Sequence, residues 1–240
     1  MKHRLVETGH GDLEASLVLV FPVLLAYEIG VLFVGRVNGA DVVTRALYTL
    51  AGSRTAYLLL QLAIALLFLL WIRRGNRWGT LRLEIAGPVL LEASIYALTL
   101  GALVTLVLDR MLGLGLTTSA IDPAHCFAML RAPAQPGFAI VAALGAGVHE
   151  ELVFRLALLG GLVALLRGSD QRFAVAIAII ASSLLFAAAH HLGAHGEPVT
   201  LHRFAFRALA GAAFGAIFWF RSLAHAVYAH VLYDLAVAMS

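Results

Sequence analysis

Seven runs of mostly apolar residues constrain the fold of this 240-residue chain more than any other feature. Most are roughly 17–25 residues long, the helix length that crosses a hydrocarbon core about 30 Å thick. Charged residues make up only 13% of the chain, against about 25% in a typical soluble domain. The expected spans are residues 14–35, 56–72, 85–108, 138–166, 173–190, 204–220 and 223–239. The sequence therefore predicts an all-α fold, a polytopic transmembrane helical bundle of about seven spans.

The charge pattern narrows the classes of partner. The formal net charge is +3, and most basic residues are arginines between the apolar runs. This pattern fits the anionic headgroups of a lipid bilayer, and no basic tract is long enough to bind nucleic acid. A single cysteine, Cys126, excludes an internal disulfide framework. We expect a multi-pass protein of the cell membrane, with residues 41–52 as a weakly amphipathic surface segment.

The chain divides at a long loop rich in Gly and Pro, residues 109–137. No convincing internal repeat and no second soluble domain are visible. Residues 1–137 form transmembrane helices of unassigned role. Residues 138–240 carry polar side chains at membrane depth, and we predict that they form the catalytic helical core.

The densest cluster of charge inside a span is Glu150, Glu151 and Arg155 in the fourth run. An ionisable side chain within a span costs roughly 2.5–3.5 kcal/mol on insertion scales, so each one is a functional candidate. Glu151 and Arg155 are four residues apart, on one face of a helix and in the favourable order for an ion pair. Glu150 lies about 100° away around an ideal helix and has no such local partner. This suits a general base, although a charge triplet that only pins helix packing is the alternative.

Two later runs add histidines. The fifth ends in Phe186-Ala-Ala-Ala-His190, which places Phe186 and His190 on one face. The last carries His230 and Asp234, again four residues apart. One carboxylate base with two imidazoles is typical of hydrolytic chemistry, in which a base activates water and donors hold an oxyanion. No cofactor is certain, but a divalent metal such as zinc could bind among Glu150, His190, His230 and Asp234.

Glu150-Glu151-x-x-x-Arg155, Phe186-x-x-x-His190 and His230-x-x-x-Asp234 together resemble the three motifs of the CPBP (Abi) intramembrane proteases. This family includes type II CAAX prenyl endopeptidases and bacteriocin-processing or immunity proteins. The resemblance covers about residues 138–238. It implies that Glu150 and His190 activate the attacking water and that His230, with residue 234, stabilises the oxyanion. Asp234 stands where the family usually has Asn. The difference matters because an ionised Asp cannot donate a hydrogen bond.

In the same resemblance Glu151 and Arg155 hold the site in shape, and Phe186 belongs to the structural support. The function it implies is intramembrane endopeptidase activity on a prenylated or membrane-anchored protein or peptide. Two alternatives come from other classes. One is a catalytically silent bacteriocin-immunity or scaffold protein, in which the motif residues serve packing. The other is a proton-coupled transporter, which would carry inverted repeats.

Overall fold

The computed structural model describes residues 13–34, 42–76, 78–81, 83–110, 113, 137–192 and 196–239, and all regular structure in these residues is helical. The expected all-α fold is therefore confirmed. The first half of the chain forms α1 (Leu13–Val34), α2 (Val42–Ala51), α3 (Arg54–Arg74), the short 3₁₀ turn η1 (Trp78–Leu81) and α4 (Leu83–Arg110). The second half forms α6 (Phe138–Glu150), η3 (Glu151–Leu159), α7 (Gly160–Leu165), α8 (Gln171–Ala189), α9 (Leu201–Phe220) and α10 (Leu223–Met239).

Five of these helices, α1, α3, α4, α8 and α9, are long and apolar enough to cross a membrane. The other two expected spans are also helical but do not form single long helices. The span expected at 138–166 continues from α6 through η3 into α7, and α10 is an apolar helix of 17 residues. The protein is thus an integral, multi-pass membrane protein.

Short polar residues begin several of the helices. The side chains of Ser53 and Thr200 each accept a hydrogen bond from a backbone N–H in the first turn of α3 and of α9. Asp170 accepts two such bonds at the start of α8. These caps satisfy backbone donors that a helix leaves unpaired at its N-terminus. They explain why α9 begins at Leu201, three residues before the span expected from hydropathy.

The outer surface of α3 is apolar. Leu59, Leu62, Leu66 and Leu67 are each about 60% exposed. An exposed apolar face of this extent is costly in water but favourable against lipid tails. The shorter α2, within the segment expected at 41–52, also exposes Leu50. In the expected loop at 109–137, residues 109 and 110 belong to α4, whereas 114–136, with Cys126, lie outside the described residues.

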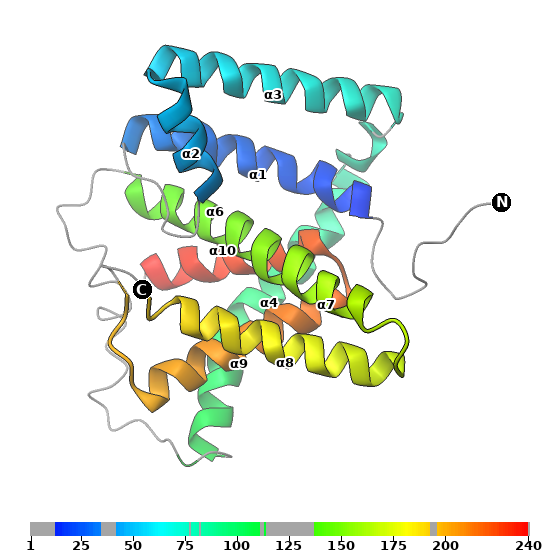
Figure 1. Ribbon diagram of the computed structural model, residues 1–240, viewed down its shortest axis with the longest axis vertical. Helices are drawn as coiled ribbons and strands as arrows, with labels where there is room; N and C mark the ends of the chain where they lie inside the picture. The colour runs from blue at the N-terminus through cyan, green and yellow to red at the C-terminus, as the bar shows by residue number, and fades with distance from the viewer. Residues whose placement is uncertain are drawn as a thin grey trace.

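The last helix, α10, lies inside the bundle and packs against α1, α4, α6 and α9 (Figure 1). Glycines allow the closest of these approaches. A Cβ atom on Gly147 of α6 would lie 2.3 Å from Val231 Cγ2 and 2.9 Å from the Val231 backbone nitrogen of α10. A Cβ on Gly145 would lie 2.3 Å from the ring of Tyr27 in α1. Two small residues, spaced by one, therefore let α6 contact a helix on either side.

Helices from the first half of the chain pack directly on the second half. In Figure 1, α4 crosses behind α10 and α9, and its Ala93, Leu100 and Val104 share a buried cluster with residues of both. Arg221, in the turn between α9 and α10, binds Glu92 of α4 with Nη2 at 2.6 Å. The helix that carries His230 is thus enclosed by α4 on one side and α6 on another. The division at residue 137 stays a prediction.

Candidate active site

The site begins where α6 changes into the π-helix η3. Glu150 is the last residue of α6, and Glu151 is the first of η3. The apolar run predicts α-helical turns throughout this span, whereas the structure has the wider π-helical turn, with i→i+5 hydrogen bonds, at Glu151–Leu159. The buried residues of η3 are Glu151, Arg155 and Leu159, which recur at every fourth position. The wider turn keeps this row of residues on one buried face, and such segments are frequent at functional sites.

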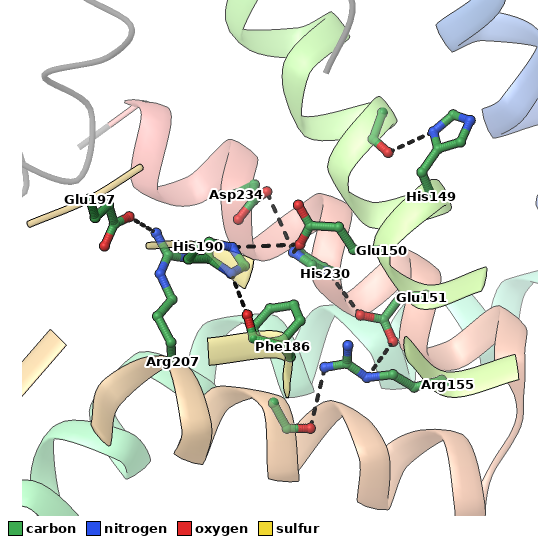
Figure 2. Close-up of polar contacts among 12 residues, drawn as sticks. His149, Glu150, Glu151, Arg155, Phe186, His190, Glu197, Arg207, His230 and Asp234 are labelled. Atoms are coloured by element: carbon green, nitrogen blue, oxygen red, sulfur yellow. Dashed lines mark hydrogen bonds and ion pairs between the residues drawn. The ribbon is translucent and has the colours of Figure 1, made fainter. Parts of the chain in front are cut away.

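Glu150 faces two histidines from different helices. Its Oε2 atom lies 3.7 Å from His190 Nε2 and 3.8 Å from His230 Nε2 (Figure 2). Both separations exceed a direct hydrogen bond, and Oε2 is buried without a hydrogen-bond partner among the described residues. Polar groups at this spacing are readily bridged by a water molecule or a substrate oxygen. The structure therefore brings together the three residues whose side chains suggested hydrolysis.

A series of contacts orients His230. Its Nδ1 donates a hydrogen bond to Glu151 Oε1 at 2.8 Å. Glu151 Oε2 forms an ion pair with Arg155 Nε at 3.1 Å, as expected from their spacing, and both side chains are almost completely buried. Arg155 Nη2 in turn donates to the backbone oxygen of Gly211 in α9 at 3.2 Å. A carboxylate on Nδ1 fixes the orientation of the ring and directs Nε2 toward Glu150.

Two aromatic rings complete this arrangement. The ring of Phe214 stacks on His230, with centroids 4.5 Å apart. The Arg155 guanidinium lies over the ring of Phe186, 4.5 Å from its centroid, a cation–π contact that helps to stabilise a buried cation. Phe186 was expected as structural support, and this contact is consistent with that role. Phe214 was not singled out, because an aromatic residue in an apolar run carries no distinguishing signal.

His190 is held from its own helix. It follows the last residue of α8, and its Nδ1 donates to the backbone oxygen of Phe186 at 2.8 Å. A carbonyl only accepts, so the proton lies on Nδ1, and Nε2 of the neutral ring is an acceptor facing Glu150. The Phe186 ring also contacts His190, with centroids 4.6 Å apart. Phe186 thus binds His190 with its backbone and supports it with its side chain.

Asp234 lies at the more exposed side of the site. Its Oδ2 is 3.7 Å from His230 Nε2, and its side chain is 28% exposed. The exposed fraction falls to 17% at His190, 10% at Glu150 and zero at Glu151. Access to Glu150 is therefore from the side of Asp234 and His190. The neighbouring His149 points away, and its Nδ1 donates to the Gly145 backbone oxygen at 2.9 Å.

Two charged residues beside His190 were missed by the sequence argument. Arg207 of α9 donates to the carboxylate of Glu197, which lies shortly before that helix, and the pair borders His190 (Figure 2). Arg207 falls inside the apolar run at 204–220, so the argument applied to Glu150 would have marked it. Glu197 lies in a polar loop and gave no comparable signal.

The described residues do not fit a metal site. No group of three or more His, Cys, Asp or Glu side chains in this part of the chain is arranged so that it could hold a metal ion. The Nδ1 atoms of His190 and His230 are bonded to Phe186 and Glu151, so the Nε2 atoms are the ring nitrogens that face Glu150.

The C-terminal part of the chain is similar to a known protein family. Residues 132–236 match the family model described as Type II CAAX prenyl endopeptidase Rce1-like. No curated protein and no solved structure matches the chain. The matched segment includes every residue of the three motifs, and it confirms the resemblance to CPBP proteases.

Proposed function

We propose that this chain, whose residues 132–236 match the type II CAAX prenyl endopeptidase Rce1-like family model, is an intramembrane endopeptidase that cuts a prenylated or membrane-anchored protein or peptide. The observation that carries the proposal is the position of Glu150, a buried carboxylate facing the Nε2 atoms of two histidines at 3.7 and 3.8 Å. In so apolar a bundle, such a group has few structural uses.

In the proposed reaction Glu150 is the general base. A water bound between Glu150 Oε2 and His190 Nε2 gives one proton to the carboxylate as its oxygen attacks the peptide carbonyl carbon. His190 Nε2 accepts a hydrogen bond from the second hydrogen of that water, because its Nδ1 proton is bonded to Phe186. The C–N bond of the tetrahedral intermediate then breaks as the protonated Glu150 gives its proton to the leaving amine, so that one carboxylic acid and one amine result.

His230 stabilises the oxyanion of the tetrahedral intermediate. To donate from Nε2 while Nδ1 donates to Glu151, the ring must carry both protons. Carboxylate oxygens of Glu150, Glu151 and Asp234 lie within 4 Å of its ring nitrogens and favour this charged form. Asp234 acts on His230 through this electrostatic contact rather than as a hydrogen-bond donor to the oxyanion.

We assign the catalytic core to residues 138–240 and a supporting role to α1 and α4, which enclose α10 and α6. The substrate reaches the site from the side of Asp234 and His190, where the exposed fraction of the side chains is highest.

The test is cleavage of a farnesylated peptide by purified protein in liposomes, compared between wild type and Glu150→Gln. The Gln variant keeps the size of the side chain and removes the base, so we expect kcat to fall by at least about a thousandfold. Glu84→Gln, at an exposed residue near the start of α4, is the matched control and retains wild-type kcat.

The same peptide without the lipid separates prenyl recognition from general membrane proteolysis. If the protein cleaves the peptide without its lipid equally well, prenylation is not required. Proteomics of a deletion strain for uncleaved membrane proteins then identifies the substrate. Cleavage by Glu150→Gln at the wild-type rate contradicts the proposal outright. A folded wild-type protein that cleaves nothing, together with a Glu150→Ala variant that complements a deletion strain, supports the silent scaffold instead.

A further inference from the structure

Helix α9 contains no residue of the three motifs, yet its residues contact groups that surround both histidines. Its Gly211 backbone oxygen accepts from Arg155, which pairs with Glu151, the partner of His230. One turn earlier, Arg207 of the same helix pairs with Glu197. Residues 207 and 211 are four apart and therefore share a face of α9. A Glu–Arg ion pair linked to α9 therefore lies beside each of the two histidines.

Glu197 contacts the end of α8 at two points and helix α9 at a third. Its backbone N–H donates to the His190 backbone oxygen at 2.9 Å. Its backbone oxygen accepts from His191 Nδ1 at 2.9 Å. Its carboxylate accepts from Arg207, and both side chains of this pair are less than one-fifth exposed. Glu197 thus connects the residue pair His190–His191 to helix α9.

The end of α8 needs such a connection. At the end of α8 the backbone hydrogen bonds span three residues instead of four. The N–H groups of His190, His191 and Leu192 each donate to the carbonyl oxygen three residues earlier, at 3.2, 3.0 and 3.2 Å. Hydrogen bonds of this kind have poorer geometry than α-helical ones, and helix ends fray. His190 therefore lies in a turn whose position depends on contacts from outside the helix.

We infer that Glu197 and Arg207 are positioning residues that hold His190 in line with Glu150, as Glu151 and Arg155 hold His230. The inference rests on the proposed protease function. The role is exerted through the backbone of residues 190 and 197, and neither charged side chain takes part in the bond-breaking steps. Without the ion pair, the last turn of α8 loses its connection to α9, and the separation of His190 Nε2 from Glu150 is no longer defined.

A purely electrostatic role is the competing explanation. Arg207 is close enough to His190 and Asp234 to act on both through its charge, and Glu197 acts on His190 with the opposite sign. Arg207→Gln removes a positive charge, and Glu197→Gln removes a negative charge. An electrostatic role moves kcat and its pH profile in opposite directions in the two variants, whereas a positioning role lowers kcat in both.

The experiment measures kcat, KM and thermal stability of the full-length protein in liposomes with the farnesylated peptide. We expect Arg207→Gln and Glu197→Gln each to lower kcat about 10- to 100-fold, with KM changed less than threefold. We expect Arg207→Lys, which keeps the cation, to retain at least part of the kcat that Arg207→Gln loses. Arg203→Gln, one turn earlier on α9, is the matched control and retains wild-type kcat.

A second readout does not need turnover. In a Glu150→Gln background, mass spectrometry follows carbethoxylation of His190 and of His225, which lies near the start of α10 beside Ser222 and Glu92. We expect His190 to react several times faster once either partner of the pair is replaced, while His225 is unchanged. Unchanged kcat and unchanged His190 labelling in folded variants overturn the inference. A rise in KM alone also overturns it, because that result assigns Arg207 to substrate binding.

These outcomes are separable from failure of the protease proposal. If Glu150→Gln abolishes cleavage and the pair variants do not reduce it, the positioning role is wrong and the protease stands. If wild type itself does not cleave, the labelling of His190 still reports on the connection to α9.

Discussion

The Nδ1 atom of His230 donates a hydrogen bond to Glu151 Oε1 at 2.8 Å, across 79 residues of sequence. This contact joins α10 to the first turn of the π-helix and fixes which ring nitrogen faces Glu150. It also gives Glu151 two partners, because its other oxygen pairs with Arg155. The arginine compensates the buried negative charge of the carboxylate, and the carboxylate orients the imidazole ring.

Replacing Glu151 by Gln should affect both functions of this residue. The amide oxygen can still accept from His230, but Arg155 is left as a buried cation without its ion pair. Breaking a buried pair in this way costs about 3–5 kcal/mol of stability. We expect kcat to fall about 10²- to 10⁴-fold, by analogy with loss of the carboxylate that orients a catalytic histidine. Thermal unfolding in detergent and single-turnover cleavage measure the two effects, and wild-type values for both would contradict this assignment.

The close contact of α6 and α10 at Gly147 predicts a steric defect. A Cβ there would lie 2.3 Å from Val231 Cγ2 and 2.9 Å from a backbone nitrogen, which cannot move alone. We expect Gly147→Ala to separate the two helices and to lower kcat at least tenfold, because Glu150 and Glu151 lie on one helix and His230 on the other. Gly161→Ala is the control, since no atom beyond the neighbouring backbone of its own helix lies within 4 Å of its Cβ position. It should leave kcat unchanged and stabilise its helix by about 0.5–1 kcal/mol. Equal kcat in the two variants would refute the steric argument.

The role of Asp234 predicts the effect of two substitutions. If Asp234 supports His230 by its charge from 3.7 Å, Asp234→Asn and Asp234→Ala both remove that support, although the amide keeps the packing. We expect both variants to lower kcat about tenfold or more. Initial rates on the farnesylated peptide over a range of pH provide the comparison. An Asn variant with wild-type activity beside an inactive Ala variant would contradict the electrostatic role and assign residue 234 as a hydrogen-bond donor.

The ion pair between Glu92 and Arg221 joins the two halves of the chain away from the site. Its hydrogen bond to Glu92 raises the pKa of the Arg221 guanidinium above its usual value, so the arginine stays charged. The Arg221 side chain is 48% exposed, and exposed pairs contribute only about 0.2–1 kcal/mol and weaken with salt. We expect a double-mutant cycle with Glu92→Gln and Arg221→Gln to give a coupling in this range, with unchanged kcat. A coupling above about 2 kcal/mol, or a loss of kcat, would place this pair in the support of the site.

Much of the fold and site could be predicted from local sequence. Long apolar runs predict helices because lipid forces the backbone to satisfy its own hydrogen bonds. Glu151 and Arg155 could be paired because residues four apart meet on one helix, and the structure has that contact. Their apolar surroundings also made Glu150, His190 and His230 conspicuous. The catalytic roles of these residues stay predictions until variants are measured.

Other features required the tertiary structure. The π-helical turn at Glu151, the bond from His230 to Glu151 and the pairing of Glu197 with Arg207 depend on where separate helices lie. Hydropathy also predicts one span at 138–166, whereas the structure divides this segment into α6, η3 and α7. The physical reason is range: helix formation and i,i+4 pairing depend on neighbours in sequence, whereas the partner of a buried charge depends on which helices pack together. The sequence alone therefore determined the helices and the chemical groups at membrane depth, and packing around α9 and α10 decided which of those groups face one another.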